Sequence, residues 1–199
     1  MSAEAAEDPV VWSWRADWTE PVRARPVPVA AVAVLVCGVL GWRVGLRAEL
    51  AAFVYLGVVG TALGFVDAAL RRLPDPLTLT AYPAGLALLG AAVPFTEDGG
   101  RRYMAALAGM AVLWVFFAVQ WFALPSALGL GDVKLSGVLG LYLGWLGSGA
   151  WVLGVFSMFV LGGLYAVGLL VLRRAGRKEA IPFGPFMLLG AFAGVVVYA

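Results

Sequence analysis

Long stretches without a single ionisable residue constrain this chain more than any other feature of its sequence. A membrane-crossing helix needs about 20 mostly apolar residues, at a rise of about 1.5 Å per residue. Six stretches lack Asp, Glu, Lys and Arg altogether: 26–42, 50–66, 76–96, 103–131, 135–172 and 180–199. Only 13% of the residues are charged and 62% are hydrophobic, whereas a soluble domain usually has about 25% charged residues. The composition therefore excludes a free-standing soluble domain.

The lengths of these stretches set the expected number of membrane-spanning helices. The stretch 135–172 contains 38 residues, about 57 Å as one helix and nearly twice the hydrocarbon core of a bilayer. We expect it to break at Gly147-Ser148-Gly149, and the tail 124–131 of the fourth stretch is typical of a loop. The stretches are apolar on all sides rather than alternating with period two, which indicates helices instead of barrel strands. The sequence therefore predicts an all-α, polytopic membrane bundle of about seven transmembrane helices, with six or eight as alternatives.

Basic residues at the ends of the apolar stretches predict the orientation of the chain. If the N-terminus is cytoplasmic, ten Lys and Arg residues lie inside and four outside. The inside set is Arg15, Arg23, Arg25, Arg71, Arg72, Lys134, Arg173, Arg174, Arg177 and Lys178. The outside set is Arg43, Arg47, Arg101 and Arg102. The positive-inside rule therefore favours a cytoplasmic N-terminus.

The first 25 residues differ in character from the rest. They are polar and rich in acidic residues, and they carry Trp12, Trp14 and Trp18. They lack the basic start and the Ala-x-Ala cleavage site of a secretory signal peptide. An interfacial segment and a disordered tail are both open for this part. We therefore divide the chain into a polar tail, 1–25, and a transmembrane domain, 26–199.

Charge and composition exclude several classes of function. The net charge is only +2 and the basic residues lie at helix ends, so no nucleic-acid partner is expected. The chain has no His and a single Cys, which argues against metal sites built from His or clustered Cys and against disulfides. Cys37 lies inside the first apolar stretch, where a buried structural thiol is the default. We expect neither a metal nor another cofactor.

Two aspartates at the edges of apolar stretches are the candidate functional residues. Asp67 directly follows 50–66, and Asp132 lies just before 135–172. The predicted topology places both at the cytoplasmic side, and an ionisable residue at membrane depth usually faces a cavity or a partner. Structural alternatives are open for each: a surface ion pair of Asp67 with Arg71, and an N-cap of the fifth helix for Asp132.

A third aspartate has a simpler interpretation. Asp75 directly precedes Pro76, and an Asp N-cap followed by a proline is common chemistry at the start of a helix. We therefore interpret Asp75 as a structural N-cap.

Paired aspartates form a complete apparatus for peptide hydrolysis. Two carboxyl groups at short range do not both ionise and instead share one proton. The ionised member takes a proton from a water that attacks the peptide carbonyl, and the protonated member polarises that carbonyl and later protonates the leaving amine. The alternative is a small non-enzymatic membrane carrier that uses Asp67 and Asp132 as a proton or ion pathway. Carriers often show internal repeats, and we find no convincing repeat in this chain.

Three blocks around these residues resemble the type IV prepilin peptidases, or leader peptidases, which are membrane aspartic proteases of the GxGD class. The sequence GLGDVK at 129–134 resembles their G-x-G-D-x-K signature. The sequence DAALRRLPDPLT at 67–78 resembles their first aspartate block, in which an Asp that ends a helix is followed by a Leu-Pro-Asp turn. The sequence IPFGPF at 181–186 resembles the segment that leads into their last helix. The resemblance covers the chain from about residue 50 to its end.

The resemblance implies roles for individual residues. Asp67 and Asp132 would form the catalytic dyad. Lys134 would tune the charge of the dyad or contact the substrate, with a snorkelling interfacial lysine as the structural alternative. Gly129 and Gly131 would let an extended peptide approach closely, because they carry no Cβ.

The last block and the substrate follow from the same resemblance. Pro182, Gly184 and Pro185 would hold an irregular, strand-like segment beside the site, or would only stiffen a loop. The implied activity is cleavage of the short basic leader from a prepilin or pseudopilin, just before its apolar helix, for type IV pilus assembly or protein secretion. The implied partners are this precursor and membrane lipid, and the implied location is the cytoplasmic face of the plasma (inner) membrane.

One departure from the family pattern changes the expected activity. Many bacterial members carry a cytoplasmic insert with two Cys pairs that bind zinc, and these members also N-methylate the cleaved product. This chain has only Cys37, and its N-terminal tail contains no Cys pair. We therefore expect a short form that is a peptidase without methyltransferase activity.

Overall fold

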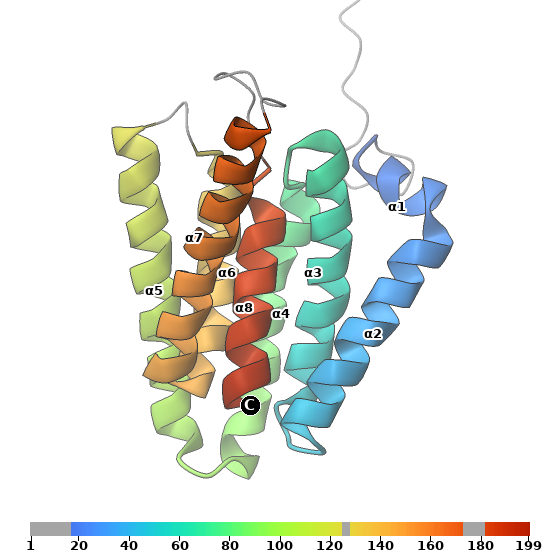
Figure 1. Cartoon of the computed structure of the whole chain (residues 1–199). Helices are drawn as coiled ribbons and strands as arrows, with labels where there is room; N and C mark the ends of the chain where they lie inside the picture. The colour runs from blue at the N-terminus through green and yellow to red at the C-terminus, as the bar shows by residue number, and fades with distance from the viewer. Residues whose placement is uncertain (1–16, 125–127, 173–181) are drawn as a thin grey trace, which may run out of the picture.

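The computed structural model describes residues 17–124, 128–172 and 182–199, and these are helical almost throughout (Figure 1). Two short elements come first, the 3-10 helix η1 (Asp17–Thr19) and the helix α1 (Glu20–Ala24). The longer helices are α2 (Pro26–Val44), α3 (Leu50–Leu70), α4 (Asp75–Ala92), α5 (Gly99–Ala123), α6 (Leu130–Leu146), α7 (Ser148–Val171) and α8 (Gly184–Tyr198). The 3-10 helix η2 (Val93–Phe95) follows α4 directly. No strand occurs in the described ranges, and the predicted all-α fold is confirmed.

The expected break in the longest apolar stretch is also confirmed. Helix α6 ends at Leu146 and α7 begins at Ser148. The residue between them, Gly147, has a φ of 105°, a backbone conformation that side chains disfavour and glycine adopts readily. A glycine at this position therefore lets two helices share one uncharged run of sequence.

The helices have the length and composition of a membrane protein. Helices α2, α3, α5 and α7, together with α4 extended by η2, are long and apolar enough to cross a membrane. Helix α8 is a shorter apolar helix of 15 residues, and α6 has 17 residues. The chain is thus a multi-pass helical membrane bundle, while the number of seven spans and the cytoplasmic side of the N-terminus stay predictions.

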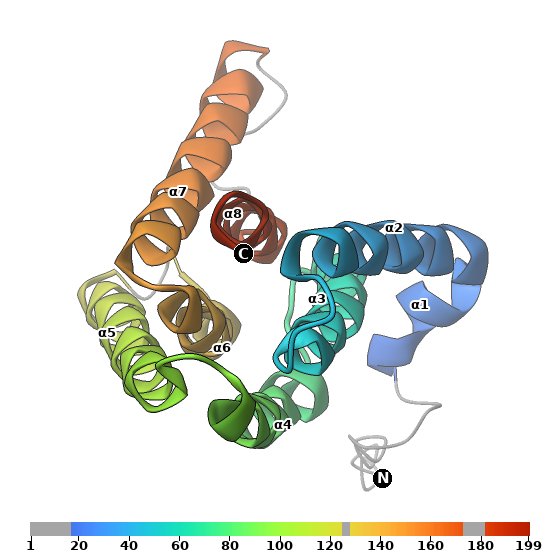
Figure 2. The ribbon, with the colours of Figure 1, turned by 90° about the horizontal axis from the view of Figure 1, so that it is seen from below.

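Helix α6 is the most buried helix of the bundle, and α8 packs against several of its neighbours. Every residue from Leu135 to Trp145 in α6 is buried. Helix α8 contacts α2, α3, α6 and α7, and Figure 2 shows it between α7 on one side and α2 and α3 on the other. Helix α5 lies so close to α6 that a Cβ on Gly140 would collide with the carbonyl oxygen of Gly109. Glycine therefore permits the backbone contact between α5 and α6, as small residues commonly do in membrane bundles.

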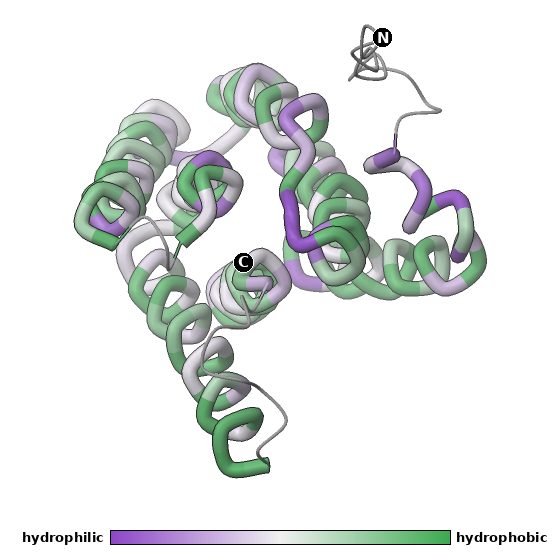
Figure 3. Tube along the Cα trace, turned by 90° about the horizontal axis from the view of Figure 1, so that it is seen from above, coloured by the Kyte–Doolittle hydropathy of each residue, from purple (hydrophilic) through white to green (hydrophobic). Residues whose placement is uncertain are grey.

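Consecutive long helices alternate in direction. As a result α2, α4, α6 and α8 begin at the end of the bundle where α3, α5 and α7 finish, at the top of Figure 1. The short helix α1 lies at this same end and contacts α3. Figure 3, a view onto this end, shows hydrophilic residues in the α1 region and at helix ends, and hydrophobic residues along the helix shafts. The predicted tail therefore includes a helical part. Trp12, Trp14 and the basic segment 173–178 lie outside the described residues.

Candidate functional site

Asp67 lies in the last turn of α3 and is buried, with 4% of its surface exposed. Its carboxylate oxygen Oδ2 accepts a hydrogen bond of 3.0 Å from the backbone N–H of Gly184, the first residue of α8. Of the ion pairs among the described residues, none joins Asp67 to Arg71. Arg71 is instead the left-handed residue that ends α3, with a φ of 53°. The alternative of a surface ion pair for Asp67 is therefore wrong.

Asp132 is the third residue of α6 and is half-buried. The N-cap of this helix is Gly129, in an extended conformation. The Oδ2 atom of Asp132 accepts a hydrogen bond of 3.2 Å from the Gly129 backbone N–H. The alternative that Asp132 is itself the N-cap is therefore wrong: its side chain reaches back to the cap, as an acidic residue at the third helical position commonly does.

The loop between α3 and α4 brings these two helix ends together. Leu73 and Pro74 in this loop are buried, and a Cβ on Gly131 would lie 2.9 Å from the Cβ of Leu73. The missing Cβ of Gly131 thus lets α6 begin against the α3–α4 loop. The space beside Gly129 is freer, since a Cβ there would meet only Asp132 Oδ2 at 3.4 Å and a backbone nitrogen at 3.9 Å. Of the two glycines, only Gly129 would accept a Cβ at ordinary contact distances.

Asp75 is not the N-cap that its position before a proline predicts. Helix α4 begins at Asp75 itself, and Pro74 holds the extended N-cap conformation. The Asp75 carboxylate instead forms an ion pair with Lys134, with 2.6 Å between Nζ and Oδ1. The physical reason for this correction is that a charged donor from α6 is a stronger partner for a carboxylate than a neutral backbone N–H. Lys134 is therefore held by a protein partner and is only partly exposed.

The segment leading into α8 is helical earlier than predicted. Phe183 is the N-cap in a right-handed helical conformation, and Gly184 and Pro185 form the first turn of α8. The strand-like conformation predicted for Pro182, Gly184 and Pro185 is therefore wrong from Phe183 onward, since proline is well suited to the first turn of a helix. Pro182 is half-exposed just before this turn. A Cβ on Gly184 would lie 2.6 Å from Asp67 Oδ2, so only glycine permits this approach.

Both candidate aspartates face the N-terminus of a helix. Asp67 receives the first N–H of α8, and Asp132 lies in the first turn of α6. The positive end of each helix dipole favours a carboxylate there and offsets part of the cost of burying one. Asp67 and Asp132 lie at the same end of the bundle, on helices α3 and α6 that both contact α8. Two carboxyl groups that approach each other can hold one ionised and one protonated form, which suits general acid–base chemistry on a water.

Tyr82 and Glu49, which both form contacts between helices, were not identified from the sequence. The Tyr82 hydroxyl donates a hydrogen bond of 2.5 Å to the backbone oxygen of Lys134. Glu49, at the opposite end of the bundle, has 1% of its surface exposed and pairs with Arg102 at 3.3 Å. Glu49 directly precedes the stretch 50–66, and Asp67 directly follows the same stretch. The criterion that identified Asp67, an acidic residue at the edge of an apolar stretch, could therefore have identified Glu49 as well.

The described part of the chain contains no group of three His, Cys, Asp or Glu side chains arranged to hold a metal ion.

Fold and site together define the class of protein: a helical membrane bundle with two aspartates gathered at one of its ends. Comparison with known families gives a match of residues 53–167 to the type IV leader peptidase family. This match covers more than half of the chain. The chain therefore belongs to the type IV leader peptidase family.

Curated relatives agree with the family match. The chain is 33% identical over 138 residues to a prepilin leader peptidase/N-methyltransferase of Aeromonas salmonicida, covering 68% of this chain and 45% of the relative. It is 32% identical over 173 residues to a protein of the same description from Dickeya chrysanthemi, covering 85% of this chain and 57% of the relative. A Pseudomonas putida relative is 29% identical over 160 residues. The chain spans about half the length of the curated relatives it matches, and comparison with solved structures gave no significant match.

Proposed function

We propose that this protein is an aspartic endopeptidase that removes the leader from a prepilin-type precursor at the cytoplasmic face of the inner membrane. The observation that carries the proposal is the placement of Asp67 and Asp132 at the same end of the bundle, each beside a helix N-terminus. Membership of the type IV leader peptidase family supports a peptidase activity. The relatives from Aeromonas salmonicida and Dickeya chrysanthemi are named as prepilin leader peptidases, and we extend this substrate class to the present chain.

The proposed reaction uses one proton shared between the two carboxyl groups. The ionised carboxylate takes a proton from a water molecule, and the resulting nucleophile attacks the carbonyl carbon of the scissile peptide bond. The protonated carboxyl donates a hydrogen bond to the carbonyl oxygen as negative charge develops on it. When the C–N bond breaks, the leaving amine takes a proton from the dyad, so that the carboxylates return to their initial protonation state.

The N–H of Gly184 has a definite part in this scheme. It donates to Asp67 Oδ2, so Asp67 is the member of the pair whose ionised form receives the better support from a neutral backbone donor. The hydrogen bond that Asp132 accepts from the backbone N–H of Gly129 is longer, at 3.2 Å. We therefore assign the general base to Asp67 and the general acid to Asp132 at the start of the reaction.

We also propose that this chain cleaves its substrate without methylating the new N-terminus. The support is that Cys37 is the single cysteine of the chain, so the two Cys pairs expected with the methyltransferase module are not supplied by this sequence. Mass spectrometry of the cleaved product, formed in the presence of a methyl donor, tests this point. An unmethylated N-terminus is expected, and a mass increase equal to one methyl group would contradict it.

The central experiment is co-expression of the full chain with a candidate precursor, followed by the precursor's shift in gel mobility. Asp67→Asn and Asp132→Asn should each lower the cleavage rate by roughly 10²–10⁴-fold, the usual contribution of general acid–base catalysis. Asp98→Asn is the matched control, because Asp98 is an exposed aspartate at the other end of the bundle. Near wild-type cleavage by either dyad variant, with the protein still in the membrane, would refute the assignment of that residue.

A further inference from the structure

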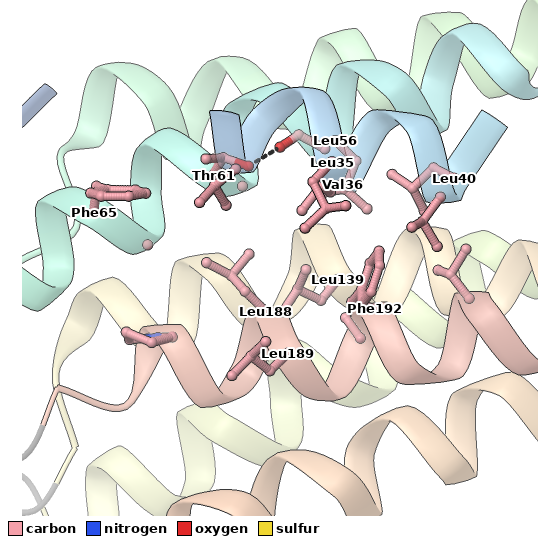
Figure 4. Close-up of a pocket in the computed structure, with 18 of the residues that line it drawn as sticks. Leu35, Val36, Leu40, Leu56, Thr61, Phe65, Leu139, Leu188, Leu189 and Phe192 are labelled. Carbon is pink, nitrogen blue, oxygen red and sulfur yellow. Dashed lines mark hydrogen bonds between the residues drawn. The ribbon is translucent and has the colours of Figure 1, made fainter. Parts of the chain in front are cut away.

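An apolar groove runs along the bundle from the candidate site into the membrane-spanning part of the structure. Its volume is ≈ 570 Å³, and its walls come from α2, α3 and α8 with one residue of α6. Figure 4 shows Leu35, Val36 and Leu40 of α2 on one side, and Leu188 and Phe192 of α8 on the other. The groove is therefore formed between helices and is not a feature of the loops.

One end of this groove adjoins the proposed active site. Phe65 and Ala68 of α3, which flank Asp67 closely in sequence, line this end together with Pro185 of α8. Pro185 follows Gly184, whose N–H bonds Asp67. From Ala68 to Leu56 the groove follows α3 over 13 residues, a length of about 18 Å at the rise of an α-helix. An occupant of the groove would thus end beside the Asp67 carboxyl group.

The lining of the groove selects an apolar occupant. Thr61 carries the only side-chain hydroxyl in the lining, and this hydroxyl donates to the backbone oxygen of Gly57 at 2.7 Å. No charged side chain belongs to the lining. A polypeptide that lies within the hydrocarbon region must satisfy its backbone internally and so must be helical. The polypeptide chemistry that fits is therefore an apolar helix.

We propose that this groove binds the apolar helix of the precursor and so delivers the peptide bond that precedes the helix to Asp67 and Asp132. This inference rests on the proposed function, and it adds the surface that recognises the substrate. The groove holds the substrate by its membrane-embedded helix, while the leader beyond the cleaved bond stays outside the groove. Recognition then depends on the helix as much as on the residues at the cleaved bond.

The first test is site-specific cross-linking with a precursor that the wild-type protein cleaves. A photoreactive benzoylphenylalanine is placed at Leu35, which lines the groove, or at the neighbouring Val34, which does not. The two positions are matched in exposure, with 67% and 73% exposed. In an Asp132→Asn background, which keeps the precursor uncut, we expect an adduct with the precursor's apolar helix from position 35 and a much weaker one from position 34. Equal adducts, or adducts from position 35 only with lipid or a second copy of this chain, would overturn the proposal.

The second test separates helix binding from cleavage. Gly64 lies in the groove wall, and a Cβ there would make only an ordinary contact of 3.4 Å with Leu188. Gly64→Leu should fill the groove and raise KM for the whole precursor by about ten-fold, a difference of about 1.4 kcal/mol. Cleavage of a short peptide that stops soon after the cleaved bond should be unchanged. Gly163→Leu is the control, because Gly163 has open space around it on α7.

The outcomes distinguish this inference from the function on which it rests. If the wild-type protein cleaves no precursor, the proposed function fails and the inference fails with it. If the wild-type protein cleaves the precursor and Gly64→Leu affects the precursor and the short peptide equally, the proposed function stands and the groove is not the binding surface for the helix.

Discussion

Replacing Gly184 with alanine probes the contact between α8 and the candidate dyad most directly. The new Cβ would lie 2.6 Å from Asp67 Oδ2, whereas 3.4 Å marks the start of ordinary contact. The carboxyl group or the start of α8 must therefore move by roughly 0.8 Å. That movement weakens or breaks the 3.0 Å hydrogen bond from the Gly184 N–H.

The size of the effect follows from this geometry. A hydrogen bond to a charged group contributes about 1.5–3 kcal/mol, and misplacement of a catalytic group by about 1 Å can lower a rate by about 10²-fold. We therefore expect Gly184→Ala to lower kcat for precursor cleavage by about 10–100-fold. The effect on KM should be small, because Gly184 acts on Asp67 and is not part of the groove lining.

The assay is steady-state cleavage of a precursor by purified protein in detergent or vesicles, together with thermal unfolding. Gly163→Ala is the matched control, because no atom lies within 4 Å of the Cβ it would add. Overpacking at Gly184 should also lower the free energy of unfolding by about 1–3 kcal/mol, so kcat is compared only for protein that is still folded. A folded Gly184→Ala variant with wild-type kcat would refute the reasoning that this N–H positions Asp67.

Three further predictions concern the contacts around the bundle. Asp75→Ala and Lys134→Ala should each lower the free energy of unfolding by no more than about 1 kcal/mol, because both side chains are partly exposed. A variant in which the two residues are exchanged should regain the lost stability, and thermal unfolding of the single and exchanged variants measures this. At the opposite end of the bundle, Arg102→Ala should lower the free energy of unfolding by about 3–5 kcal/mol, since it leaves the buried Glu49 carboxylate without its ion-pair partner. If Arg102→Ala destabilises the protein less than Glu49→Gln does, this reasoning is wrong. Gly140→Ala should separate α5 from α6 and lower the unfolding temperature, whereas an unchanged temperature would show that the bundle absorbs the added methyl group.

The helices were predictable because membrane insertion makes their signal local. A run of about 20 uncharged residues is sufficient to indicate a helix, whatever it packs against. The break at Gly147 was also predictable, because the run 135–172 is too long for one crossing and glycine is the residue that tolerates its φ of 105°. The burial of α6 along most of its length could not be predicted, because its sequence is apolar like those of the helices around it.

The contacts of the acidic residues could not be predicted in the same way. Asp67 and Asp132 were found by their position at the edge of apolar stretches, and the family signature around Asp132 made them a pair. Asp75 was misinterpreted because its neighbour Pro76 carries a strong local signal of a helix start. Its actual partner, Lys134, is 59 residues away. A local pattern gives no information on a contact of that kind.

The described acids therefore show how a single residue type acquires different roles in a membrane bundle. Glu49 and Asp67 lie at the two edges of the apolar stretch 50–66, and their roles depend on what the fold brings to them from far along the chain. Asp67 receives a backbone N–H from 117 residues away, and Glu49 receives the Arg102 guanidinium from 53 residues away. A cationic partner neutralises a carboxylate and makes it structural, whereas a neutral N–H leaves the negative charge in place, where it can take a proton from water. On this basis we expect Glu49 to be a structural residue, whereas the N–H of Gly184 as the partner of Asp67 supports the proposal that Asp67 is catalytic.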